Sequence, residues 1–175
     1  AAAKAAGCKI WRNEHDVLVL CGGGWCFVCE WGNCPPAVLG CLAEWLHGLP
    51  CPGSGYWYKG YPDPEPLDCQ PPELAALIGR SGEDLILSPL RTETLQLAQT
   101  RTGQMYWFST DLTAMLGTLA TTGGGTLLPA KDETQMPWGR WGREGRLLFL
   151  ETENCVAPAT TSKLEALDCW EEDRL

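Results

Sequence analysis

Residues 21–51 read CGGGWCFVCEWGNCPPAVLGCLAEWLHGLPC and decide the fold. They hold six of the chain's ten cysteines within thirty-one residues, together with several Gly, Pro and Trp residues. This composition does not favour one long regular element, and we expect a series of turns that cross-links hold together. The cross-links are either disulfide bonds or a bound metal ion, and the choice between them indicates the compartment.

The zinc alternative starts from Cys26-x-x-Cys29, which has the spacing of a zinc knuckle, with Cys34 and either Cys41 or His47 as further ligands. The chain has no second CxxC, and its other cysteines stand singly at long spacing. Disulfide bonds would use every thiol, so we favour a disulfide framework and no cofactor; spacing alone does not give the pairing. The framework would use Cys8, Cys21, Cys26, Cys29, Cys34, Cys41, Cys51, Cys69, Cys155 and Cys169.

Charge and hydropathy exclude two classes of partner. The net charge is −9 and the thirteen Lys and Arg residues are scattered, which argues against nucleic-acid binding. No apolar run approaches the roughly 20 residues of a membrane span, so we expect membrane attachment only through an anchor outside this sequence. The opening AAAKAAG is too short and too weakly apolar for a signal peptide, and we interpret it as a cleavage product or chain end.

Periodicity predicts a mainly β protein with a few short helices, an α+β fold. We expect a disulfide-rich N-terminal lobe, residues 1–70, packed on a small antiparallel β core, residues 71–175, that Cys155 and Cys169 close. The expected strands are residues 17–20, 25–29, 85–87, 94–98, 105–109 and 146–151, and the expected helices are residues 38–46, 73–78, 110–119 and a segment from 162. Residues 51–72 and 136–143 are rich in Gly and Pro and are expected to be loops.

The nine tryptophans give the candidate binding residues. Most Trp residues pack in cores, but those in the two expected loops have less reason to be buried. Exposed aromatic side chains beside Gly and Arg are typical of protein-recognition surfaces. The candidates are Tyr56, Trp57, Tyr58, Tyr61, Trp138 and Trp141, and the alternative is that these loops fold over the core as lids.

Catalytic motifs are weak. Gly22-Gly23-Gly24 is not followed by GK[ST], so it indicates a turn and not a phosphate loop. A cysteine protease would pair His15 or His47 with a free thiol, whereas an even number of clustered cysteines favours thiols that are already used. We therefore expect no enzymatic activity and keep a viral cysteine protease as the least favoured alternative.

Three segments resemble the envelope glycoproteins of pegiviruses and hepaciviruses, most closely the second, larger envelope glycoprotein of pegiviruses. They are residues 11–21, 107–110 and 143–158; the cysteine group at Cys26, Cys29 and Cys34 is also similar to one in the smaller first glycoprotein. The resemblance implies an extracellular, virion-surface subunit that binds a partner envelope glycoprotein and a host receptor, with no catalytic residues. Unlike such glycoproteins, the chain has no N-glycosylation acceptor, since none of its three asparagines is followed by x-Ser/Thr.

Overall fold

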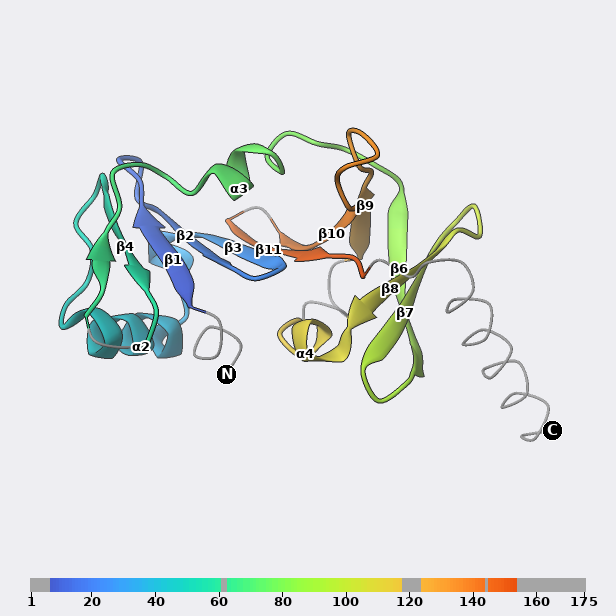
Figure 1. Ribbon diagram of the computed structural model, residues 1–175, viewed down its shortest axis with the longest axis horizontal. Helices are drawn as coiled ribbons and strands as arrows, with labels where there is room; N and C mark the ends of the chain where they lie inside the picture. Colours follow the sequence, from blue (N-terminus) through green and yellow to red (C-terminus); the bar gives the residue numbers. More distant parts are fainter. Residues whose placement is uncertain (1–6, 61–62, 118–123, 144, 154–175) are drawn as a thin grey trace.

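The computed structural model describes residues 7–60, 63–117, 124–143 and 145–153, and these form one antiparallel sheet with few short helices (Figure 1). The chain is mainly β, as the sequence predicts. The strands are β1 (Cys8–Arg12), β2 (Val17–Gly22), β3 (Trp25–Glu30), β4 (Ser54–Tyr58), β5 (Glu65–Pro66), β6 (Asp84–Arg91), β7 (Leu95–Thr100), β8 (Met105–Ser109), β9 (Gly125–Leu128), β10 (Trp138–Arg143) and β11 (Arg146–Glu151). The helices are a 3-10 turn, η1 (Trp31–Asn33), and α2 (Pro36–Leu46), α3 (Pro72–Ala75) and α4 (Thr110–Thr113).

The two expected regions contribute strands to the same sheet. The strand order is β5-β4-β1-β2-β3-β11-β10-β9-β6-β7-β8, so β11 lies between β3 and β10 and joins residues from both ends of the chain. Phe149 of β11 pairs with Cys26 of β3 and with Arg140 of β10. The expected closure through Cys155 and Cys169, and the helix from residue 162, lie outside the described residues.

Strand register defines the two faces of the sheet. Directly paired residues of neighbouring strands point to the same face. One continuous row of such pairs runs Trp57, Lys9, Cys21, Cys26, Phe149, Arg140, Thr126, Asp84 across eight strands. We call the face that holds this row the α3 face, because Leu74 of α3 and the adjoining Leu77 pack among its buried side chains.

The opposite face, which we call the α2 face, carries most of the core. Ile10, Leu18 and Leu42 of α2 belong to the larger buried cluster there, and side chains of α4 pack against the same cluster. In Figure 1, α2 and α4 lie on one side of the sheet and α3 on the other. Among the helices that the structure describes, α3, with four residues, lies on the α3 face.

Two segments expected to be loops are strands, which corrects the sequence interpretation. Ser54–Tyr58 forms β4 and Trp138–Arg143 forms β10. Their glycines provide space for indole rings: an added Cβ on Gly55 would lie 2.6 Å from the Trp11 ring, and one on Gly139 would lie 2.4 Å from the Trp141 ring. Glycine was interpreted as a turn signal, but here it allows strand packing against a large side chain.

The helix predictions are largely confirmed. The apolar spacing correctly predicted α2, which ends at His47 in the left-handed region with φ 55°. Proline at the first helical position begins α3, although this helix is shorter than expected. The N-cap of α4 is Ser109 and not Thr110, and part of the expected helix 110–119 lies outside the described residues. Within the described ranges, no helix has the length and apolar character needed to cross a bilayer.

Candidate recognition face

The α3 face collects large apolar side chains that remain exposed. Trp57 of β4 is 36% exposed, and Ile86 of β6 and Met105 of β8 are 61% and 44% exposed. Ile86 lies two positions after Asp84, the last residue of the row defined above, and therefore points to the same face. Met105 joins it through Gln99, which pairs with both residues. These three side chains therefore share one face, although the sequence separates them widely.

A fourth exposed side chain belongs to the same face. Ile78 follows α3, its backbone N–H donates to the carbonyl of Leu74 at 3.0 Å, and its side chain is 58% exposed. Leu49, in the loop after α2, is the remaining large apolar residue of the described chain that is exposed to this degree. The strand order places Trp57 on β4 and Met105 on β8 near opposite edges of the sheet, so these side chains share a face without forming one contiguous patch.

Trp57 is flanked by two lysines. The Lys59 ammonium lies 3.9 Å from the centroid of the indole ring, and the Lys9 ammonium lies 5.9 Å from it. Lys9 is the direct cross-strand neighbour of Trp57 on β1. Two ammonium groups therefore lie near the Trp57 ring, which keeps an exposed surface.

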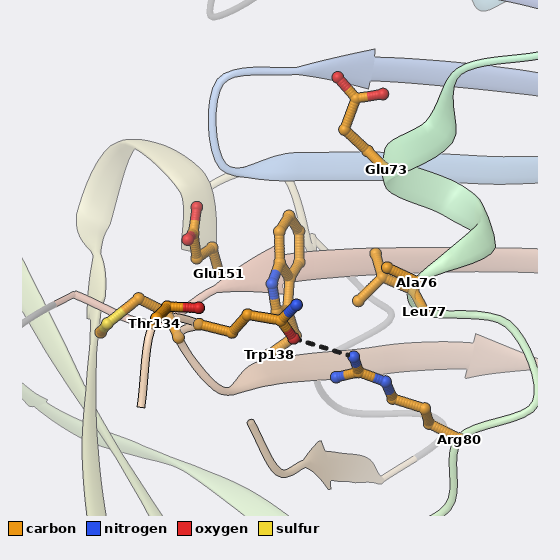
Figure 2. Close-up of a pocket in the computed structure, with 9 residues that line it drawn as sticks. Glu73, Ala76, Leu77, Arg80, Thr134, Trp138 and Glu151 are labelled. Carbon is orange, nitrogen blue, oxygen red and sulfur yellow. Dashed lines mark hydrogen bonds between the residues drawn. The ribbon is translucent and has the colours of Figure 1, made fainter. Parts of the chain in front are cut away.

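A pocket of about 240 Å³ lies between the α3 segment and strands β10 and β11. Figure 2 shows Trp138 standing in the middle of this pocket, with Glu73 at one end, Arg80 at the other and Glu151 opposite the helix. The other lining residues are Ala76, Leu77, Thr134, Gln135 and Met136. Trp138 pairs with Glu151, so it belongs to the α3 face like Trp57.

Glu73 ties the pocket to β1. Its Oε1 accepts a hydrogen bond from Lys9 Nζ at 2.6 Å, and Oε2 is buried without a hydrogen-bond partner among the described residues. Burial alone would raise the pKa of Glu73, but the contact with the Lys9 ammonium outweighs it and holds the pKa below its ordinary value. Glu73 therefore favours its ionised form, with one carboxylate oxygen buried and without a partner among the described residues.

Arg80 supplies the positive end of the pocket. Nη1 donates to the Pro129 carbonyl at 3.2 Å, and Nη2 donates to Gln135 Oε1 at 3.3 Å, the contact drawn in Figure 2. Its Nε is buried without a partner, and within the described ranges Arg80 forms no ion pair. A guanidinium held by neutral acceptors keeps its capacity to bind a carboxylate.

The pKa of Glu151 is shifted in the opposite direction to that of Glu73. Burial raises its pKa above the ordinary value, and the nearby Glu153 carboxylate adds to this effect. The pocket thus combines one stabilised carboxylate, one destabilised carboxylate, one guanidinium and an indole. These groups suit the recognition of polar side chains next to an apolar contact.

The structure separates the six aromatic candidates. Trp57 and Trp138 lie on the α3 face as described. Tyr56 and Tyr58 point to the α2 face, where Tyr58 stacks on Trp45 with ring centroids 4.8 Å apart. Trp141 is 1% exposed and packs edge-on against Phe108, so it is a core residue, and Tyr61 lies outside the described residues.

Sequence reasoning missed Glu73, Arg80, Ile86 and Met105. The sequence assigned none of these four residues a role in binding. One signal was present: Ile86 lies between Leu85 and Leu87 in an expected strand, so alternation places it on the opposite face from its neighbours.

An apolar groove of about 320 Å³ on the α2 face offers fewer recognition groups. It is lined mainly by apolar side chains, among them Leu20, Phe27 and Met115. Its one charged residue is Arg146, whose Nη2 already donates to the Asn33 carbonyl. The α3 face is therefore the better candidate.

The alternative of a zinc knuckle at Cys26 and Cys29 does not fit the sheet. Residues three apart in a strand point to opposite faces, and Cys26 packs in the cluster of the α3 face whereas Cys29 packs in that of the α2 face. One ion cannot bind two thiolates that the sheet separates in this way. Among the residues that the structure describes, no three His, Cys, Asp or Glu side chains are grouped as metal ligands.

The buried thiols also differ from a catalytic nucleophile. Burial raises the pKa of Cys8 to about 12 and that of Cys34 to about 11, and it raises the pKa of Cys29 as well. The hydrogen bond to Cys21 is the main reason why the pKa of Cys26 is raised. A nucleophilic cysteine requires the opposite shift.

Comparisons with known proteins give no relative of this chain: no protein-family model, no curated protein and no solved structure matches it.

Proposed function

We propose that the chain is a non-enzymatic recognition ectodomain of a secreted or virion-surface protein, and that the α3 face contacts its protein partner. One observation carries this proposal. Trp57 and Trp138, from distant parts of the sequence, lie on the same face of one sheet, with exposed Ile78 and Met105 on that face as well. Aromatic anchors among exposed apolar residues are typical of the energetic centres of protein interfaces.

The charges of the face indicate the chemistry of the partner. The two lysines near Trp57 are already paired, Lys9 with Glu73 and Lys59 with Glu65. Arg80, by contrast, has a guanidinium without a carboxylate partner among the described residues. A partner surface with an apolar centre and a carboxylate opposite Arg80 would satisfy this guanidinium. We therefore infer that the partner contributes Asp or Glu side chains to the contact.

The resemblance to pegivirus and hepacivirus envelope glycoproteins supports the location. In that setting the partners are a second envelope glycoprotein and a host receptor at the cell surface. The cysteine content suits the same oxidising environment.

Binding of the purified, fluorescently labelled chain to a panel of mammalian cells, measured by flow cytometry, tests the proposal. Trp57→Ala and Trp138→Ala are each expected to weaken binding about tenfold or more, the usual cost of losing an aromatic anchor. Leu49→Ala is the matched control, because Leu49 is an exposed apolar residue outside the α3 face. Absence of binding by the native chain to every cell line, or equal loss for all three variants, would overturn the proposal.

A further inference from the structure

The buried thiols form two pairs that the sequence did not reveal. Cys21 of β2 and Cys26 of β3 are directly paired in the antiparallel ladder, and Cys26 Sγ donates to Cys21 Sγ at 2.9 Å. Both side chains are almost fully buried, at 3% and 1% exposure. Neither thiol is therefore accessible to solvent or to an external partner.

The backbone already meets the geometric requirement of a disulfide bond. Directly opposed residues of antiparallel strands have Cα atoms about 4.5–5.5 Å apart, which lies inside the range of about 4.4–6.8 Å found for disulfides. The hairpin fixes this register, since Gly22 pairs with Trp25 across Gly23 and Gly24. Gly24 has φ +76°, a conformation that glycine adopts without strain.

A second pair lies on the α2 face. Cys29 and Cys34 belong to the same buried cluster, and the Cys29 thiol is near enough to help raise the pKa of Cys34. Cys29 Sγ itself donates to the Glu30 carbonyl at 3.2 Å. The 3-10 turn η1 returns the chain between them, with Cys34 N–H donating to the Trp31 carbonyl at 3.2 Å. The pairs are therefore local and lie on opposite faces of the sheet.

We propose that Cys21–Cys26 and Cys29–Cys34 are disulfide bonds of the mature protein. The first lies on the α3 face, beneath α3, and the second lies on the α2 face. Each bond forms by thiol–disulfide exchange with glutathione disulfide. Two protein thiols are oxidised to one disulfide, and one glutathione disulfide is reduced to two glutathione molecules, which take up the two protons. The bonds form during folding, because the folded chain buries these thiols. The pairing does not depend on what the α3 face binds.

The first bond bears directly on the recognition face. Cys21 and Cys26 pack against Leu74 and Leu77, the side chains that seat the α3 segment. The bond would close the β2–β3 hairpin under the helix that carries Glu73. The pocket wall would then rest on a covalently fixed support.

Peptide mapping of the native sequence tests the pairing without any variant. Chain refolded in a glutathione redox mixture is denatured, treated with N-ethylmaleimide and digested without reduction. Chymotryptic cleavage after Trp25 separates Cys21 from Cys26, and cleavage after Glu30 by Glu-C protease separates Cys29 from Cys34. We expect both pairs of fragments to stay linked until reduction.

Single variants give an independent readout. Cys21→Ser is expected to make Cys26 reactive with N-ethylmaleimide while the Cys29–Cys34 link persists, and Cys41→Ser, at an exposed position of α2, is expected to change neither link. A link from Cys21 to any cysteine other than Cys26, or maleimide on both Cys21 and Cys26 after refolding, would overturn the proposal. Either result leaves the cell-binding experiment unaffected, so the two proposals fail separately.

Discussion

Lys9 Nζ lies 2.6 Å from Glu73 Oε1, and this ion pair joins β1 to α3 on the α3 face, the candidate recognition face. The same ammonium lies 5.9 Å from the Trp57 ring, so one lysine contacts both the exposed aromatic and the wall of the pocket. The two parts of the face are therefore coupled through a single side chain.

Replacing Lys9 with methionine tests this coupling. The Glu73 pKa is lowered in the folded state, so the pair stabilises the fold above the ordinary carboxyl pKa of about 4.3, and the effect is lost as pH falls through the folded value. Both side chains are partly exposed, so we expect a loss of about 1 kcal/mol or less at pH 7. Urea denaturation of native and variant protein at pH 7 and near pH 3 measures it.

Lys131→Met is the control, because Lys131 forms no ion pair in the part of the chain that the structure describes. It should leave the unfolding free energy nearly unchanged at both pH values. A loss for Lys9→Met that stayed equally large at low pH would mean that packing of the lysine stem, and not its charge, stabilises the contact.

Glu151 gives a pH dependence of opposite sign. Its pKa is raised, first by burial and then by Glu153, so its ionised form destabilises the folded state above that pKa. Glu151→Gln is therefore expected to raise stability at pH 7 by about 0.5 kcal/mol or less, and the gain should vanish as pH falls and the native carboxyl takes up its proton. Thermal unfolding across this pH range checks it, and a gain that persisted in acid would refute the electrostatic explanation.

Sequence periodicity was sufficient for some of the regular elements. Strands β2, β6 and β11 and helix α2 follow patterns of alternation or of helical spacing. β2 and β11 are short apolar runs buried on both faces, whereas α2 buries one apolar face, and both kinds of pattern can be recognised in the sequence. The mainly β class could be predicted for the same reason.

The recognition face could not be predicted, because it depends on register between distant strands. Trp57 and Trp138 share a face only because β11 pairs with β3 and β10 with β11. The separation of Cys26 from Cys29 needed only the strand period, which should have argued against a zinc knuckle within a strand. Glycine was the misleading signal: Gly55 and Gly139 accommodate indole rings, and the sequence alone does not distinguish this use from a turn.

Gly139→Ala tests whether glycine makes room for Trp141. An added Cβ would lie 2.4 Å from the Trp141 ring and 3.0 Å from Phe108, and both rings are buried. Overpacking of this kind costs about 1–3 kcal/mol, so we expect a clear loss in the free energy of unfolding. Gly40→Ala is the matched control: Gly40 lies in α2 with nothing within 4 Å of an added Cβ, and alanine there should stabilise by about 0.5–1 kcal/mol. Equal effects of the two changes would refute the packing explanation.

Thiol reactivity of the reduced, folded chain gives the last prediction. Cys41, Cys51 and Cys69 are exposed, whereas Cys8 and Cys34 are buried with raised pKa values of about 12 and about 11. The thiolate is the reactive form of cysteine. Iodoacetamide at about pH 7.5 should therefore modify the three exposed cysteines first and modify the two buried cysteines only after the chain is unfolded. Peptide mass spectrometry after timed quenching measures each site, and the denatured reduced chain is the control in which all sites react. Modification of Cys8 or Cys34 as fast as Cys41 in the folded chain would mean that the sheet opens readily at these positions.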